Sequence, residues 1–344
     1  MKDTFPICFI KKVFKEVLNK DVLLPLKRLT YNEAMTRFGS DKPDLRFGME
    51  LVNLTELLKN SEFKVFSSAI AAGGSVCAIN ARKIASKLPR KEIDKLIEWI
   101  KAYGEKGLAW TKINLDGTSS SSYEKFLSES EILAIRNAVN AQNDDVIFIV
   151  ASDEKQTALE SLGALRCEIA RKFNIINDSE PNLLWITDFP LFEFDKEENR
   201  YVAKHHPFTA PRDEDISKLD SEPQNVYAKA YDLVLNGNEV GGGSIRINNP
   251  ELQQKMFKAL GFQQEDAYER FGFLIDAFKY GAPPHGGLAF GLDRLVMLML
   301  NCKSIRDVIA FPKVASSAEL MSDSPNTVDV KQLEELSINL NLKK

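Results

Sequence analysis

GAPPHGGLAFGLDR, residues 281–294, is the stretch of this sequence that says most about the fold. Its prolines and glycines predict a turn, followed by a short buried strand at Leu288–Phe290 and a helix over 292–300. Because that helix is apolar nearly all round, we expect it to be buried. Arg294 falls in its first turn, where the free N–H groups of a helix N-terminus already favour an anion such as phosphate. The alternative is an arginine that only pairs with a neighbouring carboxylate, at Asp293 or Glu269.

A hairpin precedes this stretch. Asn236-Gly237 is a strong signal for a two-residue turn, and it separates apolar runs at 228–235 and 239–247. Alternation along the second run places Ile245 and Ile247 on the core side. Ser244 and Arg246 then share the opposite face of the strand.

The same hairpin collects a carboxylate, three glycines and an arginine within a few residues. Gly241–Gly243 let the backbone approach a ligand closely, and the guanidinium of Arg246 suits recognition of a carboxylate or phosphate. Glu239 and Asp232, both near strand ends, could hold Mg²⁺ on a polyphosphate. The alternative is a glycine bulge in a hairpin that carries a surface arginine and a surface glutamate.

Two of the three histidines lie in the segment HHPFTAP, residues 205–211. Its two prolines exclude a helix or a central strand, so we expect a loop that brings an imidazole, at His205, over a bound substrate. A zinc site is disfavoured because adjacent histidines rarely reach one metal and no cysteine is near in sequence. The remaining alternative is a pair of solvated histidines.

Periodicity and capping signals divide the rest of the chain. An amphipathic helix is expected within 11–20, a second over Tyr31–Phe38 that ends at Gly39, and a loop at Gly39–Asp44. The middle third alternates strands and helices, as a self-contained α+β domain would. Its expected strands are 63–66, 75–79, 108–113 and 146–150; its expected helices are 93–100, 128–138 and 157–173; and 118–122 is expected to be a loop tip.

Composition narrows the class of protein. The 344 residues exceed one usual core, so we expect at least two packing units, and 44% apolar with 27% charged residues is typical of a soluble globular protein. We expect a cytoplasmic protein with no membrane span. The four scattered cysteines predict reduced, buried thiols. A formal net charge of −4 gives no overall basic field, so contact with nucleic acid would need local patches.

Together these segments resemble one family. Residues 281–294 are similar to motif 3 of the class II aminoacyl-tRNA synthetases. Tyr31–Leu51, which contains GSDKPDLRFG, resembles the aspartyl enzymes just before their bacterial insertion, the GAD domain. The segment WITDFP at 185–190 resembles the return to the catalytic fold. The histidine loop and LNGNEVGGGSIR, residues 235–246, complete a collinear series.

The resemblance implies an α+β fold, with a class II antiparallel sheet flanked by helices and an inserted α+β domain of GAD type. Residues 1–52 and 179–344 would belong to the catalytic domain and residues 53–178 to the insertion. The family forms aspartyl-adenylate from L-aspartate and ATP and transfers the aspartyl group to tRNA for aspartate, and in some members for asparagine. The family is homodimeric.

Residue roles follow from the same resemblance. His205 and Arg246 would bind the aspartate substrate. Glu239 would serve ATP and its Mg²⁺, with Asp232 as a secondary ligand. The ATP contacts near motif 3 would be Gly291, Leu292, Asp293 and Arg294.

Motifs 1 and 2 and the anticodon-binding domain of the family have no counterpart here, so we expect little activity from this chain alone. It would be a truncated or split synthetase. The alternatives are a non-catalytic paralogue that binds a nucleotide or amino acid, and a tRNA-binding subunit related to the amidotransferases, although those lack a motif 3 segment.

Overall fold

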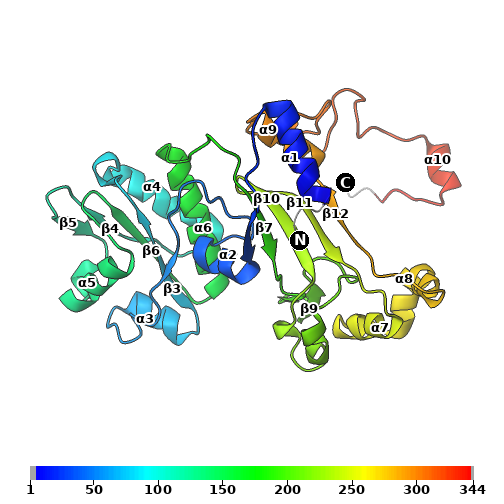
Figure 1. Cartoon of the computed structure of the whole chain (residues 1–344), viewed down its shortest axis with the longest axis horizontal. Helices are drawn as coiled ribbons and strands as arrows, with labels where there is room; N and C mark the ends of the chain where they lie inside the picture. Colours follow the sequence, from blue (N-terminus) through cyan, green and yellow to red (C-terminus); the bar gives the residue numbers. More distant parts are fainter. Residues whose placement is uncertain (1–4, 342–344) are drawn as a thin grey trace. The chain divides into compact units, whose positions relative to one another are not determined.

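The computed structural model describes residues 5–341, and the chain folds as two compact units, Met1–Phe290 and Gly291–Lys344. It is an α+β protein with largely antiparallel sheets flanked by helices, as the sequence predicts (Figure 1). Two five-stranded sheets and a two-stranded ribbon make up the β structure of the first unit.

The first sheet has the strand order β1-β7-β10-β11-β12. The strands are β1 (Lys27–Thr30), β7 (Leu183–Thr187), β10 (Ala230–Leu235), β11 (Asn238–Ile245) and β12 (Gly286–Phe290). Neighbours pair antiparallel except β1 and β7, which run parallel. Its core includes Leu184, Ile186 and Val234, which are completely buried.

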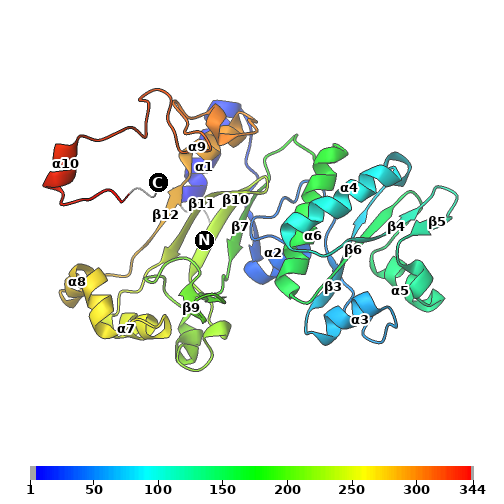
Figure 2. The same cartoon turned by 180° about the vertical axis from the view of Figure 1, so that it is seen from behind.

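The second sheet has the order β2-β3-β6-β4-β5 and is antiparallel throughout. Its strands are β2 (Val52–Asn53), β3 (Ser75–Ala81), β4 (Ala109–Ile113), β5 (Ser119–Ser121) and β6 (Val146–Ser152). Alternate residues of β3 and β6 enter two different apolar cores, so both faces of this sheet are covered. The helices α4 (Arg90–Ile100) and α6 (Lys155–Lys172) cover one face; α3 (Lys64–Ala71) and α5 (Glu129–Ala138) lie on the other, as Figure 2 shows from behind.

Helix α2 (Tyr31–Phe38) links the two sheets, and its ends are fixed by sequence signals. Thr30 and Glu33 form a reciprocal capping box at its start. Gly39 ends it with φ 65°, a conformation that favours glycine. A Cβ on Gly39 would lie 2.0 Å from the Leu159 carbonyl oxygen of α6, and one on Gly163 would lie 2.3 Å from the Gly39 carbonyl oxygen. The backbones of α2 and α6 therefore touch directly.

Other helices and strands complete the chain. In the first unit these are α1 (Phe5–Leu18), the ribbon β8 (Phe192–Asp195) with β9 (Arg200–Ala203), α7 (Pro250–Ala259) and α8 (Gln264–Lys279). Asn249 caps α7 by accepting from the Leu252 N–H, as expected for an Asn-Pro start. In the second unit they are α9 (Leu292–Met299) and α10 (Val330–Glu335).

Some local expectations were wrong. The stretch 63–66, expected as a strand, contains the N-cap and first turn of α3, where Phe66 is buried at helical spacing. The stretch 118–122, expected as a loop tip, contains β5, which pairs with β4. Ile247 is buried as expected, but Ile245 is 40% exposed and Ser244 is buried, where its hydroxyl contacts the Thr209 hydroxyl at 3.3 Å.

The motif at 281–294 forms the expected strand and helix, but neither is buried as predicted. The strand β12 is at the edge of its sheet and pairs only with β11, so its residues are half-buried or exposed. In α9 only Leu295 is buried.

Within residues 5–341, no helix has the length and apolar character needed to cross a membrane. The four cysteines are free thiols, as predicted, but only Cys77 is buried.

Candidate active site

The β10–β11 hairpin forms as predicted, and its turn explains its register. Asn236 and Gly237 both have positive φ, 51° and 78°, as a type I′ turn requires. The register then pairs Asp232 with Gly242 and Val234 with Glu239, with a bulge between Leu233 and Val234. The two predicted carboxylates are thereby carried on adjacent strands.

Two carboxylates meet over Gly242. A Cβ built on Gly242 would lie 2.4 Å from Asp232 Oδ1 and 3.3 Å from Glu239 Oε1. Glycine at this position therefore leaves the space that both carboxylate oxygens occupy. Burial raises the pKa of Asp232 to about 7, and the nearby charges of Glu239 and Asp41 add to this while Lys42 opposes it. A divalent cation would compensate the repulsion between two such carboxylates.

Arg246 follows directly after β11. Its backbone N–H donates to the His285 carbonyl oxygen at 2.9 Å, and the residue forms an isolated antiparallel bridge with Thr209. Its side-chain Nη1 is buried without a hydrogen-bond partner in the part of the chain that the structure describes. Buried donors without partners are rare and costly, and a charged one suits an anionic ligand.

The two histidines of the loop lie in different surroundings. Burial and the charge of Arg246 lower the pKa of His206, whose Nδ1 accepts from the Phe208 N–H at 3.3 Å. The ring of His205 stands edge-on to Phe189 at 4.7 Å. Burial is the main cause that lowers the pKa of His205, and the charge of Lys204 lowers it further. The charges of Asp41 and Glu193 act in the opposite direction. The charge of Arg246 therefore reaches His206, the histidine that sequence reasoning did not select.

The predicted ATP contacts, Gly291, Leu292, Asp293 and Arg294, lie in the second compact unit. Gly291 is the N-cap of α9, and Asp293 and Arg294 lie exposed in its first turn. Their contact with ATP stays a prediction.

Three charged residues near the site escaped the sequence analysis. Asp41 and Lys42 affect the titration of Asp232, and Asp41 and Lys204 affect that of His205. Asp41 and Lys42 belong to the loop after α2, which the sequence marked only as a loop. The sequence signal was the pair of opposite charges, Asp41 and Lys42, between the glycine that ends α2 and Pro43.

Comparison with known proteins identifies the family. A sequence profile of the tRNA synthetases class II (D, K and N) matches residues 7–315. The chain belongs to this family.

Its relatives within the class II synthetases are close in sequence. An aspartate–tRNA ligase of Ruminiclostridium cellulolyticum is 58% identical over 96% of this chain. An aspartate–tRNA(Asp/Asn) ligase of Caldanaerobacter subterraneus is 55% identical over 97% of it. The chain spans 56% of the length of each of these relatives. Among solved structures, the aspartyl tRNA synthetase from Entamoeba histolytica is 21% identical, with a TM-score of 0.33. The alignment covers 72% of this chain and 44% of the synthetase from Entamoeba histolytica.

Proposed function

We propose that this class II synthetase chain carries part of the active site of an aspartate–tRNA ligase. The names of its relatives support this reaction, although the chain spans only 56% of their length. We further propose that residues 53–178 form an inserted domain of GAD type, and that residues 1–52 and 179–344 belong to the catalytic domain.

The observation that carries the proposal is the buried, unsatisfied Nη1 of Arg246. A substrate carboxylate would supply the missing acceptor, and the charge-assisted bond would be stronger than one between neutral groups. The loop with His205 and His206 lies close enough for Arg246 to lower the pKa of His206. We propose that Arg246 and this loop, through His205, bind L-aspartate.

The carboxylates of Asp232 and Glu239 fit a Mg²⁺ ion that accompanies ATP. Mg²⁺ in proteins is often held by one or two carboxylates together with substrate phosphates, so two suffice without a larger cluster. No group of three or more His, Cys, Asp or Glu suited to a metal occurs among residues 5–341. When bound, the ion would neutralise charge on the phosphates. The further proposed ATP contacts are Gly291, Leu292, Asp293 and Arg294 of the second unit.

The chemistry proposed for the site needs no side-chain nucleophile. A carboxylate oxygen of aspartate attacks the α-phosphorus of ATP, and the bond from that phosphorus to the bridging oxygen breaks to release pyrophosphate. A ribose hydroxyl at the 3′ end of tRNA then attacks the acyl carbon, and AMP leaves. Arg246 binds the aspartate substrate, and Asp232 with Glu239 would hold the Mg²⁺ that neutralises charge on the phosphates. Catalysis of this kind is mostly positioning and charge neutralisation.

The proposed reaction implies the binding partners of the chain. We propose tRNA for aspartate as the acceptor, and asparagine tRNA as a second one, since relatives of both names occur. We also propose a homodimer, as in the family, and little activity from the chain alone.

Two measurements test the proposal. Calorimetry with a non-hydrolysable sulfamoyl analogue of aspartyl-adenylate should show binding, whereas no binding by the folded chain would contradict an aspartate–tRNA ligase site. Aspartate-dependent exchange of pyrophosphate into ATP should be far slower than for a full-length relative. An equal rate would contradict the expectation of low activity.

A further inference from the structure

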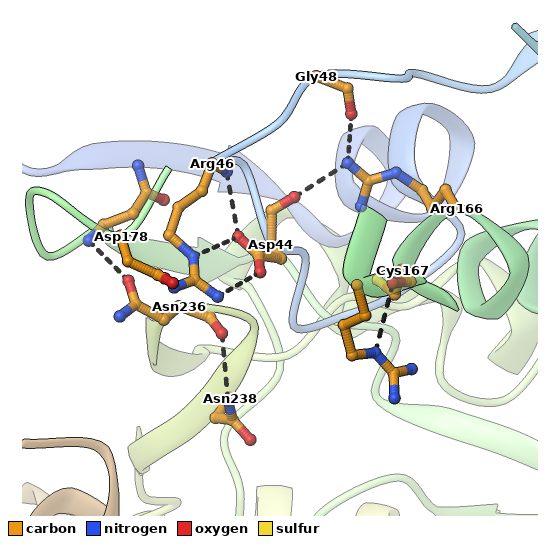
Figure 3. Close-up of polar contacts among 10 residues, drawn as sticks. Asp44, Arg46, Gly48, Arg166, Cys167, Asp178, Asn236 and Asn238 are labelled. Atoms are coloured by element: carbon orange, nitrogen blue, oxygen red, sulfur yellow. Dashed lines mark hydrogen bonds and ion pairs between the residues drawn. The ribbon is translucent and has the colours of Figure 1, made fainter. Parts of the chain in front are cut away.

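Arg166 of α6 is fully buried on the second sheet's side of the first unit. Its Nη2 donates to the carbonyl oxygens of Asp44 at 2.9 Å and Gly48 at 2.5 Å, as Figure 3 shows. Its Nε donates to the Met49 carbonyl oxygen at 3.0 Å. The guanidinium also lies 4.3 Å from the ring centroid of Phe47. A buried charge is costly, and here it binds one short stretch of backbone.

That stretch is the loop 40–49, which begins just after α2. The Asp44 carboxylate is bonded by Arg46 through Nε at 2.9 Å and Nη2 at 2.7 Å, and Arg46 also pairs with Asp178. These bonds make the loop a fixed shape rather than a loose connection. Figure 3 shows Arg166 and Arg46 on opposite sides of Asp44.

The same loop packs against the turn of the β10–β11 hairpin. A Cβ on Gly237 would lie 2.8 Å from the Asp44 Cβ. Asn236, beside it, accepts from the Asn182 N–H at 2.9 Å, so the turn is also tied to the segment that precedes β7. Any displacement of Asp44 must therefore move the turn or open a gap beside it.

The turn joins β10, which carries Asp232, to β11, which carries Glu239 two residues after Gly237. A cavity of about 750 Å³ is lined by the loop, by α6 and by the hairpin turn, and Arg166 and Lys42 are among its lining residues. The loop therefore connects Arg166 with the carboxylates over Gly242.

We propose that Arg166 is a positioning residue, which acts through the loop 40–49 on the cation-binding pair Asp232 and Glu239. The three carbonyl acceptors of Arg166 fix the loop, and the loop packs against the turn that joins the two strands carrying this pair. The inference rests on the proposed Mg²⁺ role of this pair. It also gives the segment 53–178, the proposed insertion, a role in shaping the site.

The test compares two arginines of α6. Arg166→Met removes the three donated bonds, whereas Arg171→Met changes an exposed arginine that pairs with Glu168 at 3.3 Å and lines the same cavity. With Mn²⁺ as the probe, Arg166→Met should weaken binding about tenfold, as changes behind metal ligands do. Arg171→Met should bind within twofold of wild type, and Arg166→Lys should recover part of the loss. Wild-type Mn²⁺ affinity in folded Arg166→Met would overturn the inference.

A second readout separates this inference from the proposed function and needs no cation. Amide hydrogen exchange follows the loop 40–49 in metal-free protein. In Arg166→Met the amides of this loop should exchange about tenfold faster, because the three donated bonds that hold it are lost, and in Arg171→Met they should not. If Arg166→Met is unstable, Arg166→Lys serves for the same comparison. Unchanged exchange in the loop overturns the role of Arg166, whereas a wild type that binds no Mn²⁺ overturns the cation site.

Discussion

In the second sheet, β3 and β6 bury apolar residues on both faces between helices. In the first sheet, β10 and β11 carry a carboxylate pair, and Arg246 follows β11 with a buried Nη1 that has no hydrogen-bond partner among the described residues. Side chains of the second sheet are closely packed, since Val76, Ala78, Phe148 and Ile149 are all at most 1% exposed. The hairpin β10–β11 instead places polar and charged groups where they have few partners. Such groups are expected in a binding site, so mutations in the second sheet should change stability and mutations in the hairpin should change binding.

The largest expected effect lies in the second sheet. Phe148→Ala, at a completely buried position of β6, should lower the free energy of unfolding by ~3–5 kcal/mol, because it leaves a cavity. Urea unfolding measures this. Affinity for the adenylate analogue, measured where the variant is still folded, should be unchanged. A large loss of affinity there would break the comparison.

The next largest effect is on binding rather than on stability. Arg246→Met should weaken binding of the analogue about 100-fold, or ~2.7 kcal/mol, because it removes the cation that faces the substrate carboxylate. Stability should stay equal or rise, since a buried donor without a partner is removed. Calorimetry and thermal unfolding measure the two quantities. Arg270→Met, at an exposed arginine of α8, is the matched control, and a destabilised Arg246→Met that binds normally would refute the assignment.

The effect of Asp232 on stability should depend on pH. Its pKa is raised to about 7, so the stability contributed by its neutral form is complete below the unfolded pKa of about 3.9 and is lost as pH rises through 7. Asp232→Asn should therefore gain stability progressively from pH 4 to 7 and keep a gain of ~1–3 kcal/mol above it. Urea unfolding in chelator across this range measures the gain. The exposed Asp266→Asn should show no such trend, and a gain independent of pH would argue against a raised pKa.

The smallest expected effect is at Gly242. Gly242→Ala places a Cβ 2.4 Å from Asp232 Oδ1, so that carboxylate must move and Mn²⁺ affinity should fall about tenfold. Stability should change by less than ~1 kcal/mol, because side-chain oxygens can shift. Gly287→Ala on β12, where a Cβ would meet no atom within 4 Å, is the matched control for both measurements. Equal Mn²⁺ affinity in the two variants would separate Gly242 from the cation site.

The sequence was most informative where short-range chemistry decides the structure. Helix α2 has its predicted bounds because a capping box and a left-handed glycine act within the helix itself. The β10–β11 hairpin followed from Asn236-Gly237 in the same way. The proximity of Asp232 to Glu239 follows from the register of that hairpin.

Prediction failed where distant packing decides. Phe63–Phe66 reads as a strand by its aromatic residues, yet Phe66 is buried in a core with residues far along the chain, and a helix forms. Helix α8 went unnoticed because only three of its residues are buried, so its apolar period is weak. The closeness of Asp41 and Lys42 to Asp232 arises from tertiary packing of a loop, which no local pattern encodes.

The contact between Gly39 and Gly163 has a consequence for domain exchange. Since neither position can accept a methyl group without collision with backbone, the helix that carries Gly163 can neither slide nor rotate against the one that ends at Gly39. A chimera that takes residues 53–178 from a relative should therefore assemble only if the donor segment also supplies glycine at the equivalent of position 163. That pair would be the first thing to inspect when choosing a donor.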